Sequence, residues 1–469
     1  MTLFSNASQS VTQAVGSIGS RRGLNSESNK LHALDRAAHE WYRFVLSFPP
    51  HLVSDYLQRF GITSAHTVLD PFCGTGTTLV ECKKLGTPSV GVEANPMAYF
   101  ASQVKVDWTP DPDGLLTHAT QVAEAALAEL ESEGIADDPL PLFHRIRRVR
   151  YTALRTLAPE LWNLLLTNSI SPLPLHKTLV LLDCLKKHGD ERYHRHELLA
   201  LAKVLVHSIS NLHFGPEVGI GVVKSDAAVV TPWLVGMRAM AHDLTALNRM
   251  AATPTTVYRS DSRQILRVLD PHSVDAVITS PPYPNEKDYT RTTRLESVLL
   301  GFISDKKDLQ AIKRQLVRSN TRGVYKGDDD DHWVSEHPEI HRIAEAIEAR
   351  RITLGKTSGF ERLYARVTKL YFGGMARHLA DLRTILRPGA HLAYVVGDQA
   401  SYLRVMIRTG QLLADIAQSL GYQLISIDLF RTRLATATRE QLREEVVVLQ
   451  WPGKKSFSKK PTPNAGARR

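Results

Sequence analysis

The sequence predicts an α/β protein built on a doubly wound, mainly parallel sheet, with a large helical insertion and a smaller basic insertion. Two observations carry this prediction. A strand, a glycine-rich turn, a helix and a second strand follow one another within residues 66–96. Further short apolar segments recur downstream, and most of them follow helical stretches. Such alternation of strands and helices is typical of a parallel sheet with helices on both faces.

The first strand–helix–strand unit can be justified from its residues. Thr67–Asp70 is short, apolar and β-branched at its start, which suits a buried strand. A helix is predicted over Leu79–Leu85 and ends at Gly86, and a second strand covers Ser89–Glu93. This order is the βαβ unit of a doubly wound sheet.

Later segments extend this pattern and interrupt it twice. A long amphipathic helix is predicted over Phe360–Leu386, and Arg387-Pro388-Gly389 ends it before a strand. Residues 108–255 are mostly helical in pattern, whereas residues 301–360 are polar and charged with little clear periodicity. The further predicted strands are Thr256–Tyr258, Asp275–Thr279, His391–Val396, Tyr422–Ile427 and Glu444–Trp451.

The composition is that of an ordinary globular protein, with 43% hydrophobic and 23% charged residues, which excludes wholesale disorder. Lys and Arg number 58 against 48 Asp and Glu, a net charge of +10 that hints weakly at an anionic partner. Residues 452–469 carry six basic residues and no acid, and residues 1–30 carry three basic residues and one acid. The body between these two tails is therefore nearly neutral.

Targeting and redox signals are missing from the sequence. There is no uninterrupted apolar stretch of about 18 residues, and the N-terminus lacks the pattern of a secretory signal. Three cysteines cannot make a disulfide framework, and none lies in a CxxC pair. We therefore expect a soluble cytoplasmic protein with no membrane association and no metal site.

The glycine turn after the first strand indicates a nucleoside cofactor. Gly74 and Gly76 let the backbone turn tightly and approach a ligand at the carboxyl end of the strand. The third glycine of a dinucleotide-binding turn is replaced by Thr78 or Leu79, which argues against a pyrophosphate. Glu93 ends the next strand, where a carboxylate can accept hydrogen bonds from both ribose hydroxyls. S-adenosylmethionine fits these requirements; the alternative is a sharp corner without a ligand.

The tetrapeptide Ser280–Tyr283 (Ser-Pro-Pro-Tyr) directly follows a predicted buried strand. Its two prolines lack backbone donors, so the carbonyl groups here are available as acceptors. Together with the Ser280 hydroxyl they can accept hydrogen bonds from an exocyclic amine of a nucleobase. Tyr283 offers an aromatic face on which a flipped-out base can stack. The alternative reading is a proline turn in a loop.

These motifs resemble those of the amino-methyltransferases of DNA, which modify cytosine N4 or adenine N6. The segments that carry the resemblance are DPFCGTGTT (70–78), GVEANP (91–96), SDS (260–262) and TSPPY (279–283), supported by residues 47–60, 393–398 and 429–440. The resemblance implies a Rossmann-like methyltransferase sheet with S-adenosylmethionine as methyl donor. It also implies a catalytic group and a cofactor-binding group of residues. The catalytic residues are Ser280, Pro281, Pro282 and Tyr283; the cofactor-binding residues are Phe48, Asp70, Phe72, Gly74, Gly76, Thr77, Glu93 (ribose) and Asp261 (adenine amino group).

In this family Ser-Pro-Pro-Tyr is associated more with cytosine N4, and Asp-Pro-Pro-Tyr or Asn-Pro-Pro-Tyr with adenine N6. We therefore favour cytosine N4 and keep adenine N6 as an alternative. Cytosine C5 methylation is not expected because no Pro-Cys pair is present. Two further alternatives are an RNA base-amine methyltransferase, which usually carries Asp or Asn in place of Ser280, and a non-catalytic DNA-binding protein on the same scaffold.

The chain is accordingly divided into seven predicted segments. They are a disordered arm (1–30), the cofactor-binding half of the methyltransferase domain (31–107), a mainly helical insertion (108–255), the catalytic strands with the Ser-Pro-Pro-Tyr motif (256–300), a target-DNA contact region (301–360), the C-terminal part of the methyltransferase domain (361–451) and a basic disordered tail (452–469).

Two basic segments are candidates for contact with double-stranded DNA. Residues 139–159 hold five arginines and no acid, and residues 306–326 hold seven basic residues and one acid. The second segment follows the Ser-Pro-Pro-Tyr motif and is favoured. The individual candidates are Arg147, Arg148, Lys313, Arg314, Arg318 and Arg322.

Three other expectations concern the surroundings of the site. The loop Asn211–Glu217 of the helical insertion is expected to pack over the cleft or add a second wall. The acidic run Asp328–Asp331 is expected to be a solvated turn. A separate cognate restriction endonuclease is a candidate partner.

Overall fold

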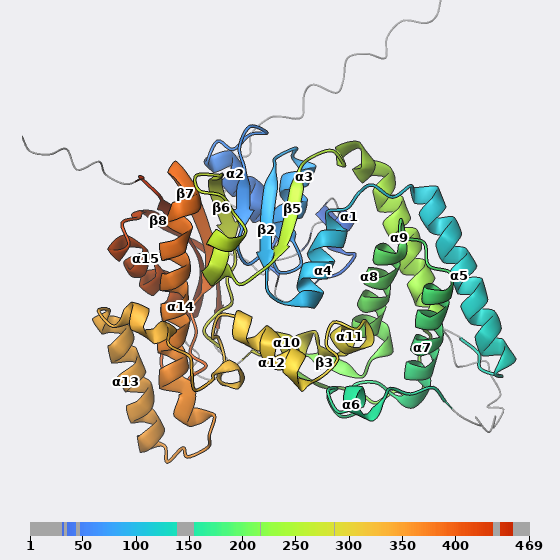
Figure 1. Cartoon of the computed structure of the whole chain (residues 1–469). Coiled ribbons are helices and arrows are strands. Elements are labelled where there is room, and N and C mark those ends of the chain that lie inside the picture. Colours follow the sequence, from blue (N-terminus) through green and yellow to red (C-terminus); the bar gives the residue numbers. More distant parts are fainter. Residues whose placement is uncertain are drawn as a thin grey trace, which may run out of the picture.

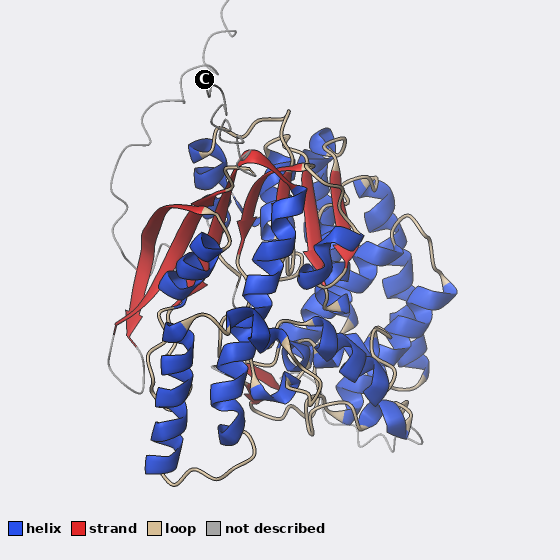
Figure 2. Ribbon diagram, turned by 60° about the vertical axis from the view of Figure 1, so that its left-hand side comes forward, coloured by secondary structure: helices blue, strands red, loops and turns tan. Residues whose placement is uncertain are grey.

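The computed structural model describes residues 31, 35–43, 47–137, 154–215, 217–285, 287–434 and 441–453. The predicted N-terminal arm, and all but the first two residues of the predicted tail, lie outside these ranges. The core is a seven-stranded sheet with the strand order β5-β2-β1-β6-β7-β9-β8 (Figures 1 and 2). A separate two-stranded hairpin, β3–β4, belongs to the helical insertion.

The sheet confirms the predicted Rossmann-like α/β class. Strands β5, β2, β1, β6 and β7 pair in parallel, and β9 runs antiparallel to both β7 and β8. Every predicted strand is present; Ser89–Glu93 has the predicted bounds, and the ends of the others are shifted. The bounds are β1 Val68–Asp70, β2 Ser89–Glu93, β5 Thr255–Arg259, β6 Val274–Thr279, β7 Leu386–Gly397, β8 Gln423–Leu434 and β9 Gln441–Gln450.

Alternate residues of a strand point to opposite faces of the sheet, so apolar side chains lie on both faces. Helices pack against both of them. Ala276 and Ile278 of β6 pack in a cluster with helix α2, whereas Val277 packs in a different cluster with helices α13, α14 and α15. The helices of the sheet domain are α2 Pro50–Arg59, α3 Thr77–Lys84, α4 Pro96–Lys105, α13 Pro338–Thr353, α14 Tyr364–Ile385 and α15 Thr409–Ser419. Among the described residues, no helix combines the length and apolar character needed to cross a membrane.

The helical insertion lies beside the sheet, at the right of Figure 1. Its long helices α5, α7, α8 and α9 share a large apolar cluster with α4 of the sheet domain. They span α5 Pro112–Ser132, α7 Pro172–Lys187, α8 His194–Val204 and α9 Val230–Leu247. The hairpin consists of β3 Leu212–Phe214 and β4 Val218–Ile220, and the short helices are α1 Arg36–His39, α6 Pro159–Trp162, α10 Tyr289–Thr292 and α11 Arg294–Leu299.

Two predictions about the later chain were wrong. Residues 301–360, expected to lack periodicity, form helix α12 (Lys306–Gln315) as well as α13. The buried residues of α13 are Ile340, Ile343, Ala344 and Ile347, a helical spacing hidden among charged neighbours. Arg387-Pro388-Gly389 lies inside β7 rather than before it, because Leu386 already pairs with Val274 and the register then shifts.

The acidic run is also not a solvated turn throughout. Asp330 is buried, and its carboxylate contacts Arg263 at 2.5 Å and Arg377 at 3.2 Å. Arg263 is held on its other side by Asp261 at 2.7 Å. This buried cluster of Asp261, Arg263 and Asp330, called here the acidic clasp, fastens residues 328–331 to the end of β5.

We expect Asp330→Ala to lower the free energy of unfolding by about 3–5 kcal/mol, because it removes one acidic partner from a buried guanidinium. Asp329→Ala, on the exposed neighbour, should change it by less than about 0.5 kcal/mol. Denaturant unfolding followed by circular dichroism measures both values. Equal stabilities of the two variants would contradict a structural role for the acidic clasp.

Candidate active site

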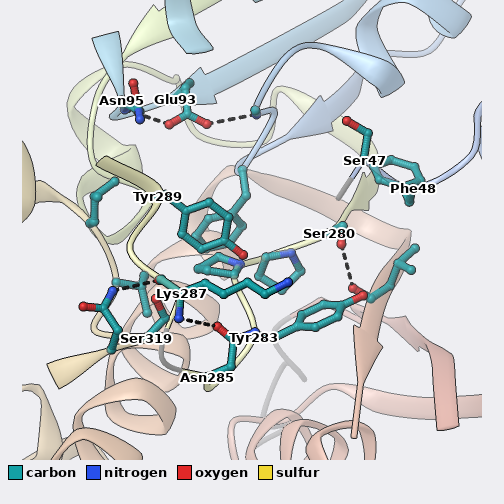
Figure 3. A pocket seen from close by; sticks show the side chains of 18 of the residues that line it. Ser47, Phe48, Glu93, Asn95, Ser280, Tyr283, Asn285, Lys287, Tyr289 and Ser319 are labelled. Carbon is teal, nitrogen blue, oxygen red and sulfur yellow. Dashed lines mark hydrogen bonds between the residues drawn. The ribbon is translucent and has the colours of Figure 1, made fainter. Parts of the chain in front are cut away.

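A cavity of about 680 Å³ opens at the carboxyl ends of β1, β2 and β6. Ligand sites of open α/β sheets lie at this edge, and this volume is typical of such sites. The predicted cofactor turn and the Ser-Pro-Pro-Tyr segment both contribute to its lining, as Figure 3 shows in part. Among the predicted residues, those that line it are Phe48, Phe72, Gly74, Thr77, Glu93, Ser280, Pro281, Pro282, Tyr283, Lys313 and Arg318.

The two glycines of the cofactor turn have different tasks. Gly74 has φ +51° and lines the cavity. It can therefore let the backbone approach a ligand closely. Gly76 has φ +83°, precedes α3 and does not line the cavity. A Cβ atom at Gly76 would lie 3.1 Å from Cβ of Ser102, so this glycine permits close packing of the turn against α4.

Glu93 is fixed at the end of β2 by two backbone donors. One carboxylate oxygen accepts from the amide of Gly74 at 2.9 Å, and the other accepts from the amide of Asn95 at 2.7 Å. Burial raises the pKa of this carboxyl group to about 7, despite the two hydrogen bonds. Each oxygen keeps acceptor capacity, so the side chain can receive a pair of ribose hydroxyls.

Asp70 does not line the cavity but joins its two halves. Its Oδ1 accepts from the Thr279 hydroxyl at 2.6 Å and from the amide of Phe72 at 3.2 Å. Burial raises its pKa to about 6. The contact with Thr279 ties the cofactor turn to the residue that precedes Ser280.

The predicted contact of Asp261 with adenine is not supported by its surroundings. Both of its carboxylate oxygens accept hydrogen bonds from Arg263, and Asp261 is not part of the cavity lining. The lining instead includes its neighbours Ser260 and Ser262. The sequence does not reveal this, because the motif SDS looks the same whichever of its side chains faces a ligand.

A buried histidine that the sequence analysis missed supports this side of the cavity. His378 of α14 contacts the Ser262 carbonyl at 3.0 Å and the Tyr394 hydroxyl at 2.8 Å. Its ring meets that of Phe72 edge to face, with 4.9 Å between centroids. Burial lowers the pKa of His378 to about 4, so the ring is neutral and acts in packing and hydrogen bonding.

The Ser-Pro-Pro-Tyr segment presents acceptors to the cavity. The Ser280 hydroxyl donates to the carbonyl oxygen of Val395 at 3.0 Å (Figure 3). Because its only proton is used there, the oxygen can act toward a ligand only as an acceptor. The ring of Tyr283 fits against Gly397, where a Cβ atom would lie 3.0 Å from its Cε2. Gly397 therefore makes room for the aromatic wall.

Residues directly after this segment also line the cavity, and the sequence analysis did not single them out. They are Asn285, Lys287, Asp288 and Tyr289. The only sequence feature that could have indicated them is that they lie close to Tyr283 in the chain.

The predicted DNA contacts are partly corrected by the structure. Arg318 is buried, and its guanidinium is held by Asp328 at 2.8 Å and by backbone carbonyls, so it is not free to bind phosphate. Lys313 pairs with Asp288 at 2.9 Å. Arg314 and Arg322 are exposed, and Arg147 and Arg148 lie outside the described residues.

The predicted second wall is present. Gly215 and Glu217, at the tip of the β3–β4 hairpin, line the cavity. Arg322 lies 3.5 Å from Glu217, and Arg291 donates to the carbonyl of Val218 at 3.2 Å. The helical insertion and the segment after Ser-Pro-Pro-Tyr thus meet at the cavity.

These features fit S-adenosylmethionine. Gly74 offers backbone beside the cavity, Glu93 offers a partly buried carboxylate with spare acceptor capacity, and Phe72 offers an apolar face. Within the described ranges, no group of three or more His, Cys, Asp or Glu side chains is arranged to hold a metal ion.

Comparison with known proteins agrees with this site. A family model described as DNA methylase, of the N6/N4 methyltransferases, matches residues 22–103. The type II methyltransferase M.BsoBI of Geobacillus stearothermophilus is 24% identical over 462 residues, covering 92% of this chain and 88% of that protein. M.AvaI of Nostoc sp. is 20% identical over 482 residues, covering 92% and 89%. M.MjaII of Methanocaldococcus jannaschii is 37% identical over 59 residues, 13% of this chain and 11% of that protein.

The matched segment spans the cofactor turn and Glu93, and the alignments with the first two relatives run through nearly the whole chain. The chain is thus similar to the N4/N6 DNA methylases over the cofactor turn and to two type II methyltransferases along most of its length, and these matches imply S-adenosylmethionine as its methyl donor.

Proposed function

We propose that the chain transfers a methyl group to the N4 atom of a cytosine that is flipped out of double-stranded DNA at a specific short sequence. One observation carries the chemistry: the Ser280 oxygen, with its proton donated to Val395, faces the same cavity as Glu93 and Gly74. An acceptor for an amine and a site for the methyl donor therefore share one enclosed space.

The transfer needs no nucleophilic side chain. When bound, S-adenosylmethionine supplies an electrophilic methyl group on a sulfonium. Ser280 and the adjacent carbonyls accept hydrogen bonds from the base amine, which favours a pyramidal nitrogen with an available lone pair. The bound donor would supply the methyl group and keep the C–S bonding electrons, and the methylated amine would release its extra proton to water. Positioning by the cavity supplies most of the rate.

One consideration supports cytosine N4, and a second supports sequence-specific modification of DNA. The first residue of the tetrapeptide is a serine, Ser280, and serine is also common at this position in the N4 enzymes that the sequence resembles. The relatives M.BsoBI and M.AvaI are named type II methyltransferases, which supports a sequence-specific modification enzyme with a separate cognate endonuclease. Exposed Arg314 is the candidate phosphate contact, whereas Arg322 pairs with Glu217 at the hairpin tip.

Base-resolution modification mapping of DNA from cells that express the chain tests this proposal. The expected result is N4-methylcytosine at one short sequence, and its absence from cells that express Ser280→Ala. Methylation of adenine would overturn the N4 assignment. Methylated RNA without methylated DNA would overturn the substrate.

Tyr283→Ala should lower kcat/KM on the cognate duplex by about 10- to 100-fold, because stacking on an aromatic ring is worth roughly 1–3 kcal/mol per base. Tyr283→Phe keeps the ring and should lose less than about threefold. Steady-state methyl transfer measures both. Full activity of the alanine variant would refute a stacked, flipped base.

S-adenosylmethionine affinity should fall as pH decreases through about 7. The raised pKa of Glu93 means that its carboxylate, the form that accepts ribose hydroxyls, disappears below that pH. Affinity at pH 6 should be about tenfold weaker than at pH 8, following the ionised fraction. Calorimetric titration measures it. The control is Glu93→Gln, which removes this titrating group and leaves Asp70 in place. Its affinity for S-adenosylmethionine should depend less on pH than that of the wild type. The same pH dependence in both proteins would contradict the role of Glu93.

A further inference from the structure

Lys287 is a cation in the part of the cavity that the Ser-Pro-Pro-Tyr segment lines. It lies four residues after Tyr283 in the chain and lines the cavity. Figure 3 shows its side chain extending across the space between Tyr289 and Tyr283. The partly buried ammonium thus lies beside the aromatic wall of the cavity.

The backbone of Lys287 is held from two sides. Its amide donates to Oδ1 of Asn285 at 3.0 Å, and its carbonyl accepts from Nδ2 of Asn320 at 2.9 Å. Asn320 comes from the segment after α12, so two separate parts of the chain fix the position of this residue. Such a residue presents its side chain at low entropic cost.

Among the described residues, the Lys287 ammonium differs from the other cations of the cavity in forming no direct ion pair, although Glu217 and Glu444 are close enough to act on it electrostatically. Lys313 pairs with Asp288, Arg318 with Asp328, and Arg431 with Glu444. No described residue forms a hydrogen bond or ion pair with the Lys287 ammonium. Burial lowers its pKa, as expected for a partly desolvated cation. Partial burial of an unpaired charge costs free energy, which an acceptor on a ligand would offset.

We propose that the Lys287 ammonium donates a hydrogen bond to the ring carbonyl O2 of the flipped cytosine and thereby selects cytosine over adenine. The inference rests on the proposed function. Cytosine carries O2 on the same edge as the reacting N4 amine. Adenine has no carbonyl group, so in its place the partly buried ammonium would lack this acceptor. A site built around a charged donor rejects a base without the matching acceptor, because the donor stays desolvated and unpaired.

A comparison of two duplexes tests this pairing atom by atom. One contains the target cytosine, and the other contains in its place the 2-aminopyridine C-nucleoside, which keeps the ring nitrogen and the amine but lacks O2. Each is assayed for kcat/KM with the wild-type chain and with Lys287→Met, which keeps side-chain length and removes the charge. Loss of O2 should cost the wild type roughly 10- to 100-fold, as for a hydrogen bond to a charged group, and cost Lys287→Met less than threefold.

Two further variants control for folding and for general charge effects. Lys287→Arg keeps a donor and should keep an O2 penalty of at least about threefold. Lys186→Met, on an exposed position of α7 away from the cavity, should match the wild type on both duplexes.

Equal O2 penalties in the wild type and Lys287→Met would overturn the assignment of Lys287. If equal penalties came with a salt dependence of binding reduced by about one ion in Lys287→Met, the residue would be a phosphate contact instead. These outcomes leave cytosine methylation intact. Methylation of adenine by the wild type would overturn the proposed function and this inference together.

Discussion

The site depends on a buried hydrogen bond between the Thr279 hydroxyl and Oδ1 of Asp70. Strands β1 and β6 are parallel neighbours, so their carboxyl ends lie about 5 Å apart at the same edge of the sheet. Asp70 ends one strand and Thr279 ends the other. The bond between them fixes the cofactor turn relative to Ser280, although about 200 residues of sequence separate the two motifs. In-line transfer tolerates little misplacement, which makes this short connection a geometric constraint on the chemistry.

The parts of this arrangement that sequence could predict are those encoded locally. The strands, the turn with Gly74 and the acid at Glu93 are contiguous patterns, and the structure shows each of them. What sequence could not predict depends on partners distant in the chain. Asp261 looked like a ligand for adenine because nothing in its motif shows that Arg263 occupies it, or that Asp330 completes the acidic clasp.

The basic segment after the catalytic motif shows the same limit for charge. Its excess of cations suggested an open DNA-binding face, but Lys313 and Arg318 are neutralised by acids that lie close only in the folded chain. Buried ion pairs of this kind order a segment more than they attract a polyanion. Arg322 is paired in the same way with Glu217, whereas Arg314 is exposed, so the net charge of this segment overstates its attraction for a polyanion.

Different parts of the chain form the inner and the outer walls of the cavity. The residues proposed to contact the cofactor and the amine come from the ends of the central sheet, whereas the outer walls come from the hairpin tip of the helical insertion and from the segment after the Ser-Pro-Pro-Tyr motif. These two walls touch through Arg322 and Glu217 and through Arg291 and the Val218 carbonyl. Because neither wall supplies the proposed methyl-transfer residues, substitutions on the walls can alter what the mouth of the cavity contacts while the geometry set by Asp70 and Thr279 stays the same.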